Sequence, residues 1–137
     1  MQRDAEKADK LNILSGQVLD AAIEVHRTLG GPGLLESIYE ESLAIELGLR
    51  GLVTARQVRI PIRYKGRHIN HPLVADLLIE NQLILEIKSV EKFNPILISQ
   101  LLTYLRLAEK PLGLIINFGE KFVKDGFHRV VNGFPDI

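Results

Sequence analysis

Apolar residues at the start of the chain recur every three or four positions, a spacing typical of amphipathic helices. This pattern predicts a first helix over 11–29 and a second over about 34–47. The segment 30–33 between them is rich in glycine and proline. Because these residues end a helix and turn the chain, it separates the two helices. The ten residues before the first helix are polar and of mixed charge, so we expect a short tail over 1–10.

Alternating apolar and polar residues then predict three strands joined by tight turns. The strands cover 58–64, 68–79 and 83–90, and the turns fall at 65–66 and 80–81. Pro61 interrupts the first of these strands. Because proline has no N–H to donate to a neighbouring strand, its position indicates a strand at the edge of a sheet.

A third helix and two further strands complete the pattern. Asn94 is a good N-cap and Pro95 suits the first helical position, so a helix is expected from there to about Ala108. The apolar run 112–118 predicts a buried strand, and 127–131 predicts a last strand. We therefore expect a single α/β domain that extends from residue 11 to residue 137.

Composition narrows the class of protein. The chain of 137 residues has no cysteine, which excludes a disulfide scaffold, a thiolate zinc site and a cysteine nucleophile. No stretch approaches the ~20 continuous apolar residues of a membrane span, and the N-terminal residues lack the apolar core of a secretion signal. We therefore expect a cytoplasmic protein without a membrane partner.

The net charge of zero conceals an uneven distribution of charge. Seventeen basic and seventeen acidic residues balance, which argues against a strongly basic, histone-like binder. Residues 1–48, however, hold five more acids than bases, and residues 49–137 hold five more bases than acids. The basic excess is concentrated in a cluster without acids: Arg56, Arg59, Arg63, Lys65 and Arg67. This basic cluster either neutralises nucleic-acid phosphates or protects an edge strand from aggregation.

Two charged residues interrupt the most apolar of the predicted strands. Glu86 and Lys88 lie in the segment Leu-Ile-Leu-Glu-Ile-Lys, and the period of two places them on the same face. Burying either charge costs several kcal/mol unless it finds partners. The pair is therefore either a salt bridge near the end of the strand or part of a functional site.

Asp76 favours the functional site. It is an acid within another apolar strand, and a hairpin turn at 80–81 places it beside the Glu86 position. Two adjacent carboxylates repel each other, and a divalent cation removes that repulsion. Carboxylate oxygens are ligands that Mg²⁺ prefers, and Lys88 can hold a water or stabilise charge on a phosphate.

The two acids and the lysine resemble a known signature. Asp76, nine intervening residues and then Glu86-Ile87-Lys88 are similar to the PD-(D/E)xK motif of a nuclease superfamily. The one departure is that the proline of the motif is missing before Asp76. The predicted order of elements also resembles the αβββαβ core of that superfamily. The resemblance therefore implies a restriction-endonuclease-like α/β fold, with a mixed central sheet flanked by helices.

Two further motifs narrow the resemblance. Residues 33–39 fit G-x-x-E-x-x-Y, the motif that names the GxxExxY family of this superfamily. Gln100 and Tyr104 resemble the Q-x-x-x-Y motif of RecB-type exonucleases. Each of these residues also has an explanation that does not need the family. Glu36 suits the N-terminus of a helix, and Tyr39 suits a core aromatic. Gln100 and Tyr104 suit an ordinary amphipathic helix.

The resemblance implies a role for each of these residues. The implied metal ligands are Asp76, Glu86, Glu36 and the carbonyl oxygen of Ile87, and the implied cofactor is Mg²⁺ or Mn²⁺. The implied catalytic residues are Lys88, Glu86, Asp76, Gln100 and Tyr104. Gln100 and Tyr104 are expected to line the site from the helix that follows the third strand.

The sequence therefore leads to three hypotheses about function. The first is a metal-dependent nuclease that hydrolyses phosphodiester bonds, with DNA as the expected nucleic acid and the basic cluster holding its backbone. A domain of this size has little surface for sequence readout, so we expect structure- or end-selective cleavage or a homodimer. The second is a non-catalytic module with the nuclease fold that binds nucleic acid or a repair protein. The third is a metal-dependent phosphoesterase with a small or RNA substrate.

Overall fold

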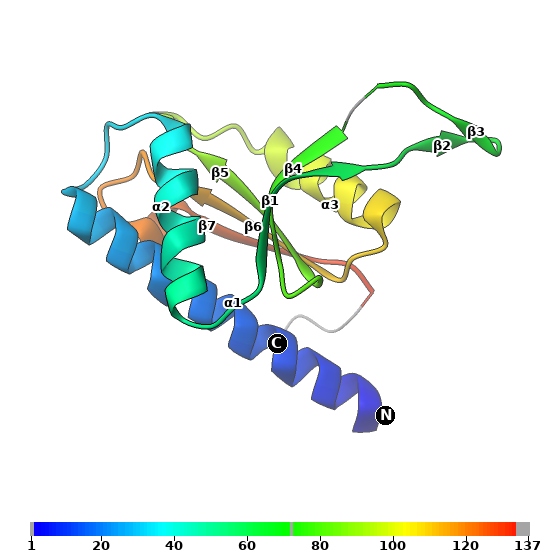
Figure 1. Ribbon diagram of the computed structural model, residues 1–137, viewed down its shortest axis with the longest axis horizontal. Coiled ribbons are helices and arrows are strands. Elements are labelled where there is room, and N and C mark those ends of the chain that lie inside the picture. Colours follow the sequence, from blue (N-terminus) through cyan, green and yellow to red (C-terminus); the bar gives the residue numbers. More distant parts are fainter. Residues whose placement is uncertain (1, 72, 134–137) are drawn as a thin grey trace.

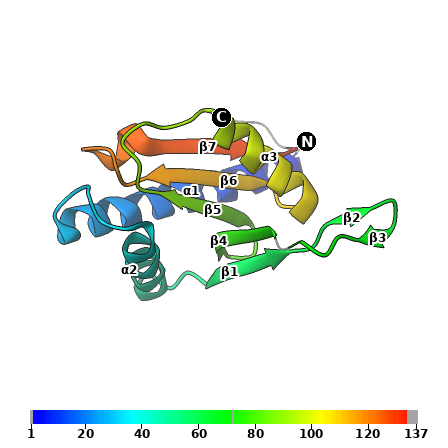
Figure 2. The ribbon, with the colours of Figure 1, turned by 90° about the horizontal axis from the view of Figure 1, so that it is seen from above.

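The structure is a computed structural model that describes residues 2–71 and 73–133. A five-stranded sheet lies between helices α1 and α2 on one face and helix α3 on the other (Figures 1 and 2). The helices are α1 (Gln2–Leu29), α2 (Glu36–Leu49) and α3 (Ile96–Ala108), with a 3₁₀ turn η1 (Val123–Gly126). The sheet strands are β1 (Thr54–Ile60), β4 (Leu73–Ile79), β5 (Leu83–Lys88), β6 (Leu112–Asn117) and β7 (Phe127–Val131).

The order of strands places β5 at the centre of the sheet. The strands run β1-β4-β5-β6-β7, with β5 and β6 parallel and the other neighbours antiparallel. The parallel pair is joined through α3, as a parallel connection requires. The predicted restriction-endonuclease-like architecture, with a mixed sheet between helices, is therefore confirmed. The predicted edge position of β1 and the full burial of β6 are confirmed as well.

Side chains of β5 separate the two faces of the sheet. Leu85 and Ile87 pack into the larger core cluster, together with α1 and α2. Ile84 packs into a smaller cluster against α3. Because side chains alternate along a strand, Glu86 and Lys88 follow Ile84 on the α3 face. The charges that the sequence placed in an apolar strand therefore point toward the helix that carries the Gln-x-x-x-Tyr motif.

The first helix is longer than its apolar pattern indicated. Helix α1 begins at Gln2, so the predicted tail is wrong for residues 2–10, and Met1 lies outside the described residues. Ala8 is fully buried and Leu11 is 4% exposed, so the buried face of the helix extends into the polar segment through one small residue. No helix within the described part of the chain combines the length and apolar character needed to cross a bilayer.

Each of the first two predicted strands is divided in two. The predicted strand 58–64 is interrupted at Pro61, which has no N–H and cannot continue the ladder. The predicted strand 68–79 is divided as well, into β3 (Arg67–His68) and β4. The predicted turn at Lys65 and Gly66 is confirmed, with φ values of 49° and 77° that suit a tight hairpin turn.

These divisions produce a small hairpin that projects from the end of the sheet (Figures 1 and 2). Its strands are β2 (Arg63–Tyr64) and β3, which pair with each other and form a separate two-stranded sheet. A hydrogen bond of 2.9 Å from the N–H of Ile69 to the carbonyl of Ile62 closes its base. We call residues 62–69 the arm.

Candidate active site

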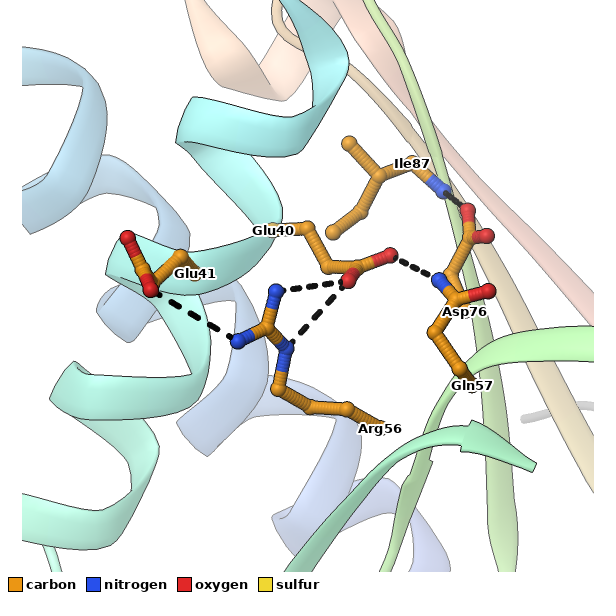
Figure 3. Close-up of polar contacts among 6 residues, drawn as sticks. All are labelled: Glu40, Glu41, Arg56, Gln57, Asp76 and Ile87. Atoms are coloured by element: carbon orange, nitrogen blue, oxygen red, sulfur yellow. Dashed lines mark hydrogen bonds and ion pairs between the residues drawn. The ribbon is translucent and has the colours of Figure 1, made fainter.

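Strands β4 and β5 part where the acids of the predicted signature lie. Their pairing extends over Leu77–Ile79 of β4, and Asp76 is the first residue beyond it. The Oδ2 atom of Asp76 accepts a hydrogen bond of 2.8 Å from the backbone N–H of Ile87 (Figure 3). This carboxylate therefore takes the place of a strand partner, and it lies close enough to Glu86 for the two carboxyl groups to interact.

The surroundings of Glu86 are unfavourable for an unaccompanied carboxylate. Burial first, and then the neighbouring Asp76, raise the pKa of Glu86 to about 8, while Lys88 acts in the opposite direction. The Oε1 atom of Glu86 is buried and has no hydrogen-bond partner. No ion pair among the described residues joins Glu86 to Lys88. The interpretation of this pair as a salt bridge is therefore wrong. A ligand that brings positive charge would satisfy this group.

A pocket of about 220 Å³ opens between β5 and α3. Its polar lining consists of Glu86, Lys88, Gln100 and Tyr104. Gln100 donates a hydrogen bond of 2.9 Å from Nε2 to the Tyr104 hydroxyl, one helical turn away. Burial, and then the negative charge of Glu86, raise the pKa of Tyr104, so its hydroxyl keeps its proton and remains a donor. The structure therefore gathers four of the predicted catalytic residues around one pocket.

Glu36 begins α2 and reaches the segment that leaves β5. Its Oε1 atom accepts a hydrogen bond of 3.3 Å from the backbone N–H of Ser89. Within the described residues, no group of three or more histidine or acidic side chains is arranged to hold a metal ion. Glu36 is therefore not gathered with Asp76 and Glu86, and of the predicted side-chain ligands only those two acids come together.

Tyr39, the last residue of the G-x-x-E-x-x-Y segment, anchors the loop that precedes α2. Its hydroxyl donates to the carbonyl of Gly31 at 2.7 Å and accepts the N–H of Leu34 at 3.3 Å. Its ring is fully buried and stacks on Phe118, with ring centroids 4.4 Å apart. These contacts support the interpretation of Tyr39 as a core aromatic that holds the start of α2 against the sheet.

The segment after β5 is fixed by a buried amide that sequence reasoning did not single out. Asn117, fully buried at the end of β6, accepts the N–H groups of Val90 and Gly119 and donates to the carbonyl of Val90. Each of these hydrogen bonds is 3.0 Å long. The one signal in the sequence is a polar residue near the end of an otherwise apolar run. These contacts fix the exit of β5 next to Lys88.

The predicted basic cluster is divided between two places. Arg56 pairs with α2, its Nη2 atom 2.9 Å from Glu40 Oε2 and its Nη1 atom 3.8 Å from Glu41 Oε1 (Figure 3). Its charge is therefore balanced within the fold. The other four members are also exposed, and none of them is in an ion pair among the described residues: Arg59 near the end of β1, and Arg63, Lys65 and Arg67 on the arm. On the arm, Tyr64 is 62% exposed, and the Nζ atom of Lys65 lies 5.5 Å from the centre of its ring.

Glu40 is a second buried acid close to the site, and it was not among the predicted functional residues. It is 7% exposed, and its Oε1 atom accepts a hydrogen bond of 2.6 Å from Gln57 Nε2. Its Oε2 atom accepts two hydrogen bonds from Arg56 (Figure 3). The helical spacing placed Glu40 on the same face as Glu36, but nothing in the sequence connected it with Gln57.

Fold and site together define the class of protein. A mixed sheet between helices, with two carboxylates at the parting of its central strands, is a restriction-endonuclease-like architecture. A family model described as the PD-(D/E)XK nuclease superfamily matches residues 12–130. The chain therefore belongs to the PD-(D/E)XK nuclease superfamily, whose members generally use divalent metal ions. A search of curated proteins and a search of solved structures found no match.

Proposed function

We propose that this protein is a metal-dependent nuclease that hydrolyses phosphodiester bonds in DNA. One observation carries the proposal: Asp76 and Glu86 lie together where β4 and β5 part, and a buried oxygen of Glu86 has no partner. Lys88 lines the same pocket as Glu86. Membership of a nuclease superfamily supports this assignment of the site.

The oxygen atoms at the site fit a divalent metal ion. Carboxylate and carbonyl oxygens are the hard ligands that Mg²⁺ and Mn²⁺ bind in proteins. Asp76, Glu86 and the carbonyl of Ile87 would hold the ion. When bound, the ion would supply a Lewis acid that lowers the pKa of water and offsets charge on the phosphate.

The other residues of the pocket suit a phosphate undergoing hydrolysis. The ammonium group of Lys88 orients a water or stabilises the negative charge that develops on the phosphate. The Tyr104 hydroxyl, held by Gln100, donates a hydrogen bond into the pocket. Apolar side chains complete the lining and reduce solvent screening of these interactions: Val74, Leu97, Leu101 and Ile115.

The four members of the basic cluster other than Arg56 are proposed to bind the substrate backbone. The three cations of the arm lie close together in sequence, and Arg59 precedes them near the end of β1. Cations of this kind contact phosphates without reading sequence, and they displace counterions when they do. Arg56 has no part in this role, because its guanidinium is engaged by Glu40 and Glu41.

A cleavage assay with the full chain tests this function. Single-stranded, duplex and branched DNA, and RNA, are incubated with Mg²⁺ or Mn²⁺ and, in parallel, with EDTA. We expect metal-dependent cleavage of DNA, reduced at least about 100-fold in Asp76→Ala and in Lys88→Ala. Glu91→Ala and Lys92→Ala are matched controls, because both residues are exposed and lie just beyond β5. Circular dichroism verifies that all four variants fold.

Cleavage that persists in EDTA, or in both site variants, contradicts the proposal. The absence of cleavage on every substrate, together with the absence of Asp76-dependent Mn²⁺ binding, also contradicts it and favours a non-catalytic binding module. If only RNA is cleaved, the proposed nuclease activity stands and its substrate is RNA instead of DNA.

A further inference from the structure

Strand β4 changes face at Asp76. Residues two apart in a regular strand point to the same face of the sheet. Ala75, however, packs into the cluster against α3, whereas Leu77 packs into the cluster with α1 and α2. The pairing of β1 with β4 is regular on both sides of this point, but Gln57, the residue opposite Asp76, is outside it. The change of face therefore falls at the candidate metal ligand.

The backbone of Gln57 shows how the change of face is made. Its φ angle is +52°, in the left-handed region that residues with a Cβ atom rarely adopt. Neighbouring residues of a regular strand point to opposite faces, yet Arg56 and Gln57 both reach Glu40 on α2 (Figure 3). The left-handed conformation therefore turns the Gln57 side chain to the α2 face.

Glu40 is the group that holds Gln57 in this conformation. A strained backbone persists only where its surroundings over-determine it. The Glu40 side chain is 10% exposed, its charge is balanced by Arg56, and its carboxylate accepts a hydrogen bond of 2.6 Å from the Gln57 amide. Because the Glu40 carboxylate is buried and its charge is balanced, its position is fixed. The hydrogen bond from the Gln57 side chain to this fixed acceptor therefore restrains the backbone of β1.

We propose that Glu40 is a positioning residue for Asp76. By fixing Gln57 it maintains the change of face in both strands, which turns the Asp76 carboxylate toward the N–H of Ile87. Without Glu40, residue 57 loses the contact that favours its left-handed conformation, the Asp76 carboxylate is oriented less well, and the hydrogen bond from Ile87 to Asp76 weakens. The proposal concerns the same site as the proposed nuclease function and rests on it for its catalytic consequence.

The backbone amide of Ile87 reports the position of Asp76 without any metal ion. Its proton is hydrogen-bonded to the Asp76 carboxylate, so nuclear magnetic resonance detects the loss of that bond as an upfield shift and faster hydrogen exchange. Asp76→Ala provides the reference for a broken bond, and we expect Glu40→Ala to change the Ile87 amide in the same direction. Glu41→Ala is the matched control, because Glu41 also contacts Arg56 but its side chain is 68% exposed.

Two substitutions of Gln57 separate its backbone from its side chain. Gln57→Ala and Gln57→Gly both remove the hydrogen bond to Glu40, but glycine adopts a φ of +52° at no steric cost. We therefore expect the Ile87 amide of Gln57→Gly to remain closer to the wild-type position than that of Gln57→Ala. Gln57 is exposed, so this pair also provides the test if Glu40→Ala does not fold.

The catalytic consequence is measured with Mn²⁺ and with DNA. Groups that orient metal ligands typically change metal affinity or activity by 10- to 100-fold, so Glu40→Ala should bind Mn²⁺ about tenfold more weakly. Its kcat should fall by a similar factor, while its KM for DNA stays within about twofold, because Glu40 lies away from the arm that is proposed to bind the backbone. Glu41→Ala should keep both constants.

The two proposals fail in different ways. A folded Glu40→Ala protein whose Ile87 amide matches the wild type overturns the positioning role, whatever the activity of the wild type. Equal changes at the Ile87 amide in Gln57→Ala and Gln57→Gly overturn it as well. If the Ile87 amide responds as expected but the wild type neither binds Mn²⁺ nor cleaves DNA, the positioning role stands and the nuclease function fails.

Discussion

Two acids that are withdrawn from solvent show how the surroundings of a residue decide its role. Both carboxylate oxygens of Glu40 accept hydrogen bonds, from Gln57 and from Arg56. Glu86, in contrast, has a buried oxygen without a partner and a second carboxylate, Asp76, beside it. An acid with hydrogen-bond partners stabilises the fold, whereas a buried oxygen without a partner, beside a second carboxylate, costs free energy that a bound cation would offset.

The raised pKa of Glu86 predicts that the metal-free protein loses stability as pH rises. Its pKa is raised from 4.5 to about 8, so between these values the folded protein binds a proton that the unfolded protein has released. The free energy of unfolding therefore decreases with pH across this range. The glutamine of Glu86→Gln stays neutral at every pH. Chemical denaturation in EDTA should therefore show that the free energy of unfolding of Glu86→Gln, relative to that of the wild type, increases by at least about 1 kcal/mol from pH 5 to pH 8.

A matched variant guards this prediction against other titrating groups. Glu91→Gln removes an exposed carboxylate from the segment that follows β5, and its pH dependence should equal that of the wild type. If the wild type and Glu86→Gln differ in stability by the same amount at every pH, the Glu86 carboxyl does not carry a raised pKa.

The buried amide of Asn117 predicts a large loss of stability on truncation. Asn117→Ala leaves the N–H and carbonyl of Val90 and the N–H of Gly119 without their partner. We expect the free energy of unfolding to fall by about 2–4 kcal/mol, measured by denaturation in urea. Asn132→Ala, which removes one partly buried hydrogen bond to Lys110, should cost about 1 kcal/mol. Equal losses of stability in the two variants would show that the three hydrogen bonds of Asn117 stabilise the fold no more than a single partly buried hydrogen bond.

At the scale of elements, the proposed binding and the proposed chemistry lie in different parts of the fold. The pocket lies between β5 and α3, whereas three exposed cations lie on the arm, which is joined to the sheet through β1 and β4. The strands of the arm contribute two residue pairs and no part of either core cluster. Changes of charge on the arm should therefore leave the pocket intact.

The arm predicts an effect on binding that is separate from catalysis. Arg63→Ala/Arg67→Ala should weaken DNA binding and reduce the slope of log K against log salt by up to about 2, roughly one for each phosphate that is no longer neutralised. The value of kcat at saturating DNA should stay within about twofold. Fluorescence anisotropy over a series of salt concentrations measures the slope.

The control for the arm removes the same charge elsewhere. Lys7→Ala/Lys10→Ala takes two exposed cations from α1, and it should keep the wild-type salt slope. If both double variants reduce the slope equally, binding depends on net charge and not on the arm.

At the scale of the whole molecule, the site is assembled from both layers of helices. Helix α2 supplies Glu40, α3 supplies Gln100 and Tyr104, and the central strands supply the acids and Lys88. Such a site exists only in the folded chain, because its groups are far apart in sequence. Ligands that bind the folded state alone stabilise it in proportion to the logarithm of their concentration.

Metal binding is therefore expected to stabilise the entire domain. At a Mn²⁺ concentration 100 times its Kd, the gain is about 2.7 kcal/mol, which corresponds to a rise in Tm of roughly 5–15 °C for a domain of this size. Differential scanning calorimetry should show this rise in the wild type and in Glu91→Ala, and its loss in Asp76→Ala. A rise of equal size in Asp76→Ala would place the bound Mn²⁺ elsewhere.

The order of the elements, the central strand and the site residues on β5 follow from the sequence because they depend on local periodicity. Apolar runs bounded by turn residues determine β5 and β6, and the period of two determines that Glu86 and Lys88 share a face. The turn at 80–81 has positive φ at both positions, and it was predicted from residue type alone. The proximity of Asp76 to Glu86 could therefore be anticipated.

Only the tertiary structure decided how the acids are presented. A left-handed Gln57 is not favoured by its own sequence, and its side chain donates to Glu40, 17 residues away in the chain. The separation of Glu36 from the two acids likewise depends on where α2 docks against the end of β5. The local sequence specifies which residues are polar and which face of the strand each occupies as long as the strand keeps its period of two. Long-range packing decides where a strand departs from its period, because it alone can offset the free energy of a strained backbone.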